Sequence, residues 1–442
     1  MKTVVFCLVC AATLSQSSQA QTKRWSLREC CDYAIEHNIS IKQQQNQCRQ
    51  QEVQLSTAKN SRLPDLSASA SQNFSFGRGL TAANTYSNTN TSSTSFQLGT
   101  SVPLFTGFQI PNQIKMNQLN LEAATADLEK AKNDIRLQVA QAYVQILYDM
   151  EIGDVARRQV TIDSMQVVRL QALVDNGKAA EATLSQQKAT LANSHLTATQ
   201  ADNNTRLAIL TLTQLLELPT PEDFGIVRPD LSTISDGSLA ALSPDAIYAE
   251  ALGLKPEIAA QQLRLQAYNR NIKIAQAGYY PTLSLSGGLG TNYYTTSGFT
   301  SDSFGEQLKN NFSQYIGLSL SIPIFNRFQT RNNVRTARIS LENQQLQLDN
   351  TKKTLYKEIQ QVYCNALNAQ TKAQSSQEAL ASSLDAFKLM QAKYENGKAT
   401  ITEFNESKNN YLKSESDLVQ ARYELLYQQA LIEFYRGRDL NF

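Results

Sequence analysis

The sequence predicts a mainly α-helical chain with a membrane β-barrel portion, in which long coiled-coil helices adjoin four strands that copies of the chain share. Three observations predict this class: an internal repeat, two very long segments with a helical heptad pattern, and four short segments of apolar–polar alternation. The 442 residues carry a formal net charge of only +2, so no nucleic-acid partner is expected.

Residues 1–20 are typical of an export signal peptide. Lys2 supplies the positive start, residues 3–14 a short apolar run, and Ser18–Ala20 a small-x-small cleavage site. The apolar run is too short to span a bilayer. Cys10 raises the alternative of a lipoprotein, but the residue before it is bulky where such sites carry a small one. Ordinary cleavage and export are therefore favoured.

Four cysteines follow the signal peptide, and three of them lie close together in the sequence. Export permits a disulfide from Cys48 to either Cys30 or Cys31, whereas free thiols are an equally good interpretation. Cys364 is distant from the other three, and these four cysteines form no C-x-x-C motif.

The mature chain is a duplication. Residues 21–217 and 246–442 show the same succession of patterns, and residues 218–245 connect them irregularly. The hairpin sequence Asn176–Ala179 recurs letter for letter as Asn396–Ala399, 220 residues later. Two further matches keep this order: Ser101–Phe105 with Ser321–Phe325 at the same offset, and Leu63–Ser67 with Tyr280–Ser284 at an offset of 217. Several matches in one order indicate two copies of one structural unit.

Each copy is expected to open with a helix, at residues 40–62 and 257–279, which a proline ends. Two strands follow, in which Leu, Ile, Phe or Ala alternate with Ser, Gly, Asn or Gln. A half-buried sheet of a soluble protein shows the same period, but nothing else in the sequence offers it a core. The favoured interpretation is that the apolar face of these strands contacts lipid and the polar face contacts water inside a barrel. The strands are expected at residues 66–76, 96–102, 283–289 and 316–322.

Two polar segments, residues 77–94 and 291–312, separate the strands of each pair and are expected to be extracellular loops. After each strand pair comes a long helix, predicted at 109–175 and 327–395, which extends roughly 100 Å at about 1.5 Å per residue. A shorter return helix follows each. A heptad in the first long helix predicts coiled-coil packing. The heptad residues are Leu121, Leu128, Ile135 and Ala142, and the return helices are expected at 179–217 and 399–436.

Four strands imply an oligomer. A sheet that spans a membrane must close, because an open edge leaves backbone groups unpaired in hydrocarbon. Four strands are too few, since the smallest membrane barrels use eight. Two chains give eight strands and a filled interior, whereas three give twelve and an open bore. A homotrimer is the better solution.

The chain resembles the TolC family of outer-membrane efflux proteins. The resemblance rests on the signal peptide, the duplication, the S-[VI]-P-[LI]-F strand ends and the Y-x-x-G hairpin at Tyr394–Gly397, and it covers essentially the whole mature chain. It implies a twelve-stranded barrel in outer-membrane lipid of a Gram-negative bacterium, continuous with a long periplasmic helical tunnel. It also implies a passive exit duct for a tripartite efflux or type I secretion system, with a periplasmic adaptor and an inner-membrane transporter as partners.

The two hairpin tips are candidate docking sites. Gly177 and Gly397 each follow an asparagine, which suits the positive φ of a helix end. A helix stop explains them fully, and the resemblance adds that such tips dock the adaptor. The candidate tip residues are Asn176, Gly177, Lys178, Asn396, Gly397 and Lys398. The asparagines depart from the apolar residue that family members often carry there.

Glu403 and Glu406 form an i, i+3 pair just beyond the second tip. The resemblance implies that they narrow the periplasmic entrance, where three chains bring six carboxylates together and favour cations. A solvated helix surface is an equally good interpretation. Tyr394 matches a family tyrosine that holds the entrance closed, and coiled-coil packing explains it as well.

No catalytic constellation, phosphate-binding loop or metal motif occurs, so neither an enzyme nor a cofactor is expected. His37 and His195 lie in helical stretches without a ligand-spaced partner. Two alternatives to a channel remain. One is a periplasm-spanning scaffold or adhesin, which needs no alternating strands, and the other is an exported enzyme on a helical frame.

Overall fold

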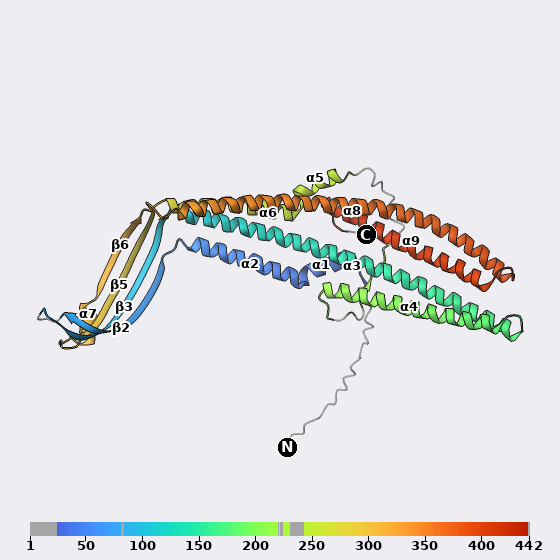
Figure 1. The fold of residues 1–442 in the computed structure, drawn as a ribbon, viewed down its shortest axis with the longest axis horizontal. Helices are drawn as coiled ribbons and strands as arrows, with labels where there is room; N and C mark the ends of the chain where they lie inside the picture. Colours follow the sequence, from blue (N-terminus) through green and yellow to red (C-terminus); the bar gives the residue numbers. More distant parts are fainter. Residues whose placement is uncertain (1–23, 81–83, 220, 222–223, 230–242, 441–442) are drawn as a thin grey trace, which may run out of the picture.

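The computed structural model describes residues 24–80, 84–219, 221, 224–229 and 243–440. The predicted signal peptide, residues 1–20 with Cys10, lies outside these residues. The molecule is elongated, with a sheet at one end and two helical hairpins that reach the other end (Figure 1).

The helices follow the predicted duplication. The long helices match the prediction closely, and the return helices are a few residues shorter than expected. Helices of the two halves recur at an offset of 217 or 220 residues. The first half contains α1 (Leu27–His37), α2 (Ile39–Asn60), α3 (Gln109–Asp175) and α4 (Glu181–Leu215). The second contains α5 (Pro244–Leu254), α6 (Pro256–Gln276), α8 (Gln329–Glu395) and α9 (Ile401–Tyr435).

Helices α1 and α5 were not predicted, and both begin at a serine cap. Ser26 and Glu29 form a capping box, and the Ser243 side chain accepts from the backbone of Ala246. Figure 1 shows α2 continuing the line of α4 along α3, and α6 continuing the line of α9 along α8. Helix α6 contacts both α3 and α8, so it joins the two halves in one helical wall.

The main sheet has the order β2-β3-β5-β6 and is antiparallel throughout. Its strands are β2 (Asp65–Leu80), β3 (Tyr86–Thr106), β5 (Thr282–Thr296) and β6 (Ser313–Ser321). The register aligns Val102, Leu285 and Leu318 in one row across three strands. Because side chains alternate between faces, this row confirms that the apolar residues share one face. Strands β2 and β6 lie at the edges of this sheet.

The prediction of polar loops between the strands was wrong. Residues 77–80 and 86–94 continue β2 and β3, and Arg78 pairs with Asn88. In the second half β5 continues to Thr296, and the short helix α7 (Phe304–Asn310) follows it. Thr and Ser can sustain an antiparallel ladder although they are polar. Polarity therefore did not mark the end of pairing here.

The prediction that residues 218–245 are irregular also needs correction. Within them, β4 (Gly225–Ile226) pairs in parallel with β1 (Arg24–Trp25), and α5 begins at Pro244. Residues 220, 222–223 and 230–242 lie outside the described part. The Tyr143 hydroxyl donates to the carbonyl oxygen of Val227 at 2.6 Å, which ties the pair to the middle of α3.

The described cysteines form no disulfide. Cys30 and Cys31 are buried in a core cluster against α3. The Cys48 thiol donates to the carbonyl oxygen of Ala124 at 3.3 Å, away from either possible partner. None of the helices in the described ranges is at once long and apolar enough to cross a membrane.

Candidate functional site

Both hairpin tips turn through a left-handed glycine. Gly177 and Gly397 have φ of +69° and +71°, as the Asn-Gly sequence predicts. In the second tip the Lys398 backbone N–H donates to the carbonyl oxygen of Lys393 at 2.8 Å, and the Asn396 amide donates to that of Ala392 at 2.7 Å. The first tip repeats these contacts. The asparagines therefore cap carbonyls of the preceding helix.

Replacing Gly397 by alanine is expected to destabilise the tip by about 1 kcal/mol, because an L-residue is strained at positive φ. A Cβ there meets no atom within 4 Å, so the cost is conformational rather than steric. Amide hydrogen exchange in the last turn of α8 measures this loss of stability, and we expect about fivefold faster exchange in Gly397→Ala than in the parent protein. Gly305→Ala is the control, since Gly305 also has open space but no positive φ. Equal changes in both variants contradict the prediction.

Glu403 has a local partner. Its carboxylate accepts hydrogen bonds from the Thr400 backbone N–H at 2.7 Å and from the Thr400 hydroxyl at 2.9 Å, which completes a capping box at the start of α9. These hydrogen bonds lower the pKa of the Glu403 carboxyl. Ala180, at the start of α4, provides no such cap. Glu406 lies one turn further along α9 and is exposed.

Tyr394 lies where the two hairpins meet. Its ring stacks on Phe404 of α9 with 4.9 Å between centroids, and the Arg169 guanidinium lies 5.2 Å from its centroid. Arg169 of α3 also donates to the carbonyl oxygen of Glu395 at 3.4 Å. This tyrosine therefore takes part both in packing within its own hairpin and in a contact with the other.

A buried ion pair joins the hairpins above the tips. Asp163 of α3 pairs with Lys408 of α9, and both side chains are completely buried. The Ser194 hydroxyl donates to the same carboxylate at 2.6 Å, and the Gln187 amide at 3.3 Å. Asn405 donates to Gln187 at 3.0 Å, which extends the network to a second residue of α9. Such hydrogen bonding is what a buried charge requires.

This network was missed by sequence reasoning. The repeat shows Lys188 and Lys408 at equivalent positions, which suggests equivalent surroundings. Only Lys408 is buried, because only it faces a carboxylate of the other hairpin, whereas Lys188 is exposed. A second interhairpin pair lies nearby, with Arg158 of α3 2.6 Å from Glu415 of α9.

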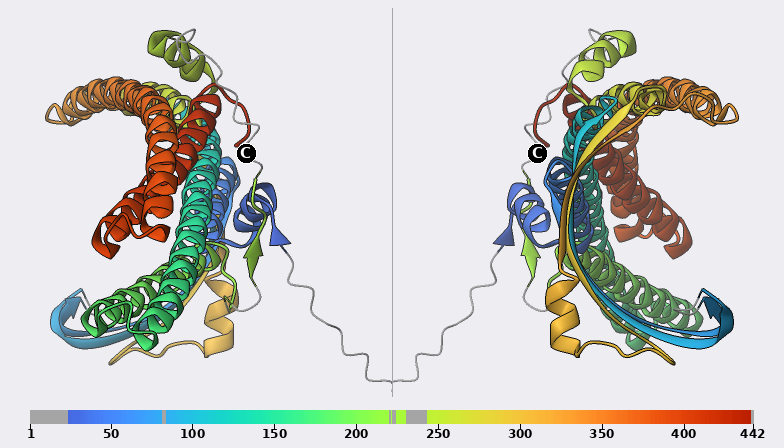
Figure 2. Two further views of the ribbon diagram at one scale, coloured as in Figure 1. Left: turned by 90° about the vertical axis from the view of Figure 1, so that its right-hand side faces the viewer. Right: turned by 90° about the vertical axis from the view of Figure 1, so that its left-hand side faces the viewer.

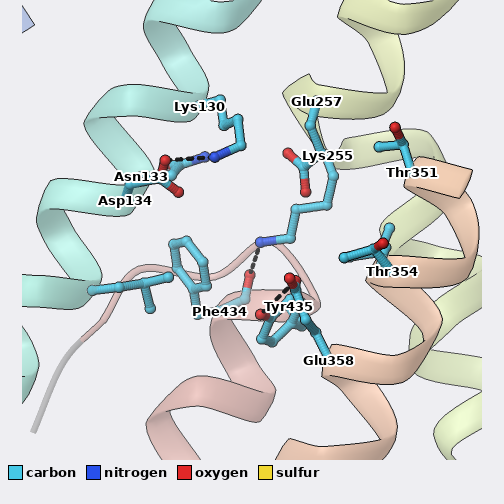
Figure 3. A pocket seen from close by; sticks show the side chains of 12 residues that line it. Lys130, Asn133, Asp134, Lys255, Glu257, Thr351, Thr354, Glu358, Phe434 and Tyr435 are labelled. Atoms are coloured by element: carbon cyan, nitrogen blue, oxygen red, sulfur yellow. Dashed lines mark hydrogen bonds and ion pairs between the residues drawn. The ribbon is translucent and has the colours of Figure 1, made fainter. Parts of the chain in front are cut away.

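A polar cavity of about 260 Å³ lies where α9 ends and α6 begins (Figure 3). Lys255 donates to the carbonyl oxygen of Phe434 at 3.2 Å, and its ammonium lies 3.7 Å from the Phe434 ring centroid and 4.6 Å from that of Tyr435. Burial lowers the pKa of Lys255 to about 8, although Glu257 and Glu358 oppose this shift. The aromatic rings and the carbonyl hold the cation in place.

In the first half, the equivalent region lies where α4 ends and α2 begins. There Asn38 takes the place of Lys255 and donates to the carbonyl oxygen of Leu215 at 3.0 Å. His37 stacks on Tyr33, and His195 is exposed on α4. Within the described ranges, no three His, Cys, Asp or Glu residues are grouped as metal ligands.

A sequence model described as outer membrane efflux protein matches residues 31–217 and 247–438, which is most of the chain. The chain belongs to this family. It is 22% identical to the outer membrane efflux protein BepC of Brucella suis over 394 residues, covering 89% of this chain and 81% of BepC. It is 24% identical to OprJ of Pseudomonas aeruginosa over 442 residues, covering 97% of this chain and 88% of OprJ.

Solved structures share this fold. VceC from Vibrio cholerae aligns with a TM-score of 0.76 at 18% identity, over 94% of this chain and 97% of VceC. CusC aligns with a TM-score of 0.77 at 18% identity, over 93% of this chain and 92% of CusC. The predicted fold of one chain, long helices that adjoin four strands, is confirmed.

Family membership decides between the functions left open by the sequence. Members of this family are channels and ducts. This efflux protein is an outer-membrane exit duct of tripartite efflux, with a long periplasmic helical portion. A scaffold without a transport role is therefore set aside. Family members form trimers and act with periplasmic adaptors and inner-membrane pumps.

Proposed function

We propose that three copies of this chain form the duct, that Glu403 and Glu406 line its periplasmic entrance, and that both hairpin tips dock a periplasmic adaptor. The adaptor connects the duct to an inner-membrane transporter, which supplies the energy. The observation that carries the proposal is the four-stranded sheet, which has an apolar face and two open edges.

The edges of this sheet complement each other. Strands β2 and β6 run in opposite directions, because neighbours are antiparallel across the order β2-β3-β5-β6. Strand β6 of one copy can therefore pair with β2 of the next and continue the antiparallel pattern. In the hydrocarbon of a membrane, the backbone N–H and C=O groups of both edges must be paired, because no water is present to bond them. Viewed along the long axis, sheet and helices follow one concave arc, as segments of a tube do (Figure 2).

The exposure of the apolar face supports a lipid contact. Strand β6 carries exposed Ile316, Leu318 and Leu320, while the intervening residues are Gly317 and Ser319. An apolar surface of this length is rare on a soluble monomer. A lipid annulus covers it without a further protein.

The experiment is purification in detergent followed by planar-bilayer recording. We expect a heat-resistant species of three times the chain mass and stepwise single-channel currents. A monomer without channel activity contradicts the proposed trimeric duct. Cross-linking from cysteines placed at Gly177 and Gly397 tests the docking role, and capture of a lipid or of the sheet end of another copy contradicts it.

Neutralising the entrance is expected to change ion selectivity. In the Glu403→Gln/Glu406→Gln variant, six carboxylates are removed from the trimer, so we expect cation preference to fall several-fold. Reversal potentials in a salt gradient measure this preference. Asp385→Asn is the matched control, since Asp385 is an exposed carboxylate of the companion helix α8. Unchanged reversal potentials in the double variant place the pair on the outer surface.

A further inference from the structure

We propose that α4 of one copy packs against α8 of the next copy, with His195 facing Glu378 across the contact between chains. This contact, called the seam below, rests on the proposed trimer. Its occupant is a second copy of this chain. The template for the seam is the contact that the chain already makes between its own two halves.

The template follows from the repeat. Within one chain, α3 of the first half contacts α6 and α9 of the second half. In a closed ring of three duplicated chains, each second half is followed by the first half of the next chain. Helix α8, the equivalent of α3, then meets α2 and α4 of that next chain, which are the equivalents of α6 and α9. Each contact can be transferred at the offsets of 220 and 217 residues.

The exposed surface of α8 supports this arrangement. Leu119 of α3 is 4% exposed, whereas its equivalent on α8, Ile339, is 59% exposed. Leu147 is fully buried, whereas its equivalent, Leu367, is 38% exposed. These positions keep apolar side chains although nothing within one chain covers them to the same degree. A second copy covers them in the way that the second half covers α3.

The charges at the seam are complementary. The interhairpin pair of Arg158 on α3 and Glu415 on α9 transfers to Glu378 on α8 and His195 on α4 of the next chain. The signs are exchanged between the helices, but an acid still faces a base. Both residues are exposed within one chain. This match gives the exposed His195 a partner in the assembled trimer.

The seam lacks the buried ion pair of the template. Asp163 on α3 and Lys408 on α9 transfer to Ser383 on α8 and Lys188 on α4 of the next chain. The base is retained and the acid is absent. Each chain therefore holds its own hairpins together by a buried charge pair, whereas neighbouring chains meet without one. We infer that the seams are the weaker contacts of the helical tunnel.

Cross-linking tests the placement. The variant Glu378→Cys/His195→Cys, in a background with Cys48→Ser and Cys364→Ser, is treated with a short bismaleimide in the assembled full-length protein. We expect covalent dimers and trimers on denaturing gels. Arg158→Cys/Glu415→Cys in the same background is the control and should be linked within one chain at monomer mass. Assembled trimers that give no product between chains from the first pair overturn the proposal. Absence of trimers before treatment identifies failure of the proposed function itself.

A substitution at Ser383 tests the missing charge pair. Ser383→Asp supplies the acid opposite Lys188, with Ser414 at the position equivalent to Ser194 to donate a hydrogen bond. We expect trimers to dissociate about tenfold more slowly in denaturing detergent, the effect of one charged hydrogen bond. Ser383→Asn should dissociate like the parent protein, and Ser383→Asp/Lys188→Met should dissociate at least as fast as the parent, because its introduced carboxylate has no cation. A dissociation rate for Ser383→Asp that does not depend on Lys188 overturns the assignment.

Discussion

Replacing Lys408 by methionine is expected to lower the free energy of unfolding of the helical hairpins by about 3–5 kcal/mol, because it leaves the Asp163 carboxylate buried without a cation. Both side chains of the pair are completely buried, so water cannot replace the lost partner. Methionine retains most of the lysine stem, which separates the loss of charge from the loss of volume. Denaturant unfolding followed by circular dichroism measures the change.

Two variants make this result interpretable. Lys188→Met removes the repeat-equivalent lysine, which is exposed within the chain and faces no carboxylate at the proposed seam, and should change stability by no more than about 0.5 kcal/mol. Lys408→Met/Asp163→Asn removes both charges and should recover a large part of the loss, since an amide can still accept from Ser194. If Lys408→Met and Lys188→Met unfold alike, the buried pair does not stabilise the contact between hairpins.

Placing arginine at Leu318 is expected to prevent barrel assembly. Leu318 lies in the apolar row with Val102 and Leu285 and is 65% exposed in the single chain. Arginine on the lipid face costs about 2–4 kcal/mol near the bilayer midplane, and a trimer carries three copies. Quantifying heat-resistant trimers in the outer-membrane fraction measures the effect, with a loss of most of the signal expected.

Ser319→Arg is the matched control for this prediction. Ser319 is the next residue of β6 and points to the opposite face. There an arginine meets the aqueous interior, so trimers should assemble and only conductance should change. Equal loss of trimers in both variants contradicts a lipid face on the side of Leu318.

Sequence reasoning predicted the regular elements because their patterns are local. The long helix α3 was predicted at its observed bounds, since the Asn-Gly turn marks its end. The strands were located by alternation, but their length was underestimated because Thr and Ser at the far ends look like loop residues. Their pairing depends on the ladder across Arg78 and Asn88, which requires the partner strand.

Less of the candidate site than of the fold is predictable from the sequence. The left-handed turns at Gly177 and Gly397 are predictable, because glycine adopts positive φ without a steric cost and commonly follows the last residue of a helix. Glu403 and Tyr394 are predicted entrance residues, but the sequence does not predict the capping hydrogen bond to Thr400 or the contact with Arg169. The Arg169 contact joins residues more than two hundred positions apart, and no local pattern records it.

The sequence by itself determined that the chain is a duplication of helices and strands, with an apolar strand face that must close in lipid. Those properties depend on period and composition, which each segment carries alone. Only the tertiary structure decided that the two halves are unequal where they meet. Lys188 and Lys408 occupy equivalent positions in the repeat, yet only Lys408 faces a carboxylate and is buried. The reason is physical: a buried charge is stable only beside its partner, and that partner comes from a distant helix.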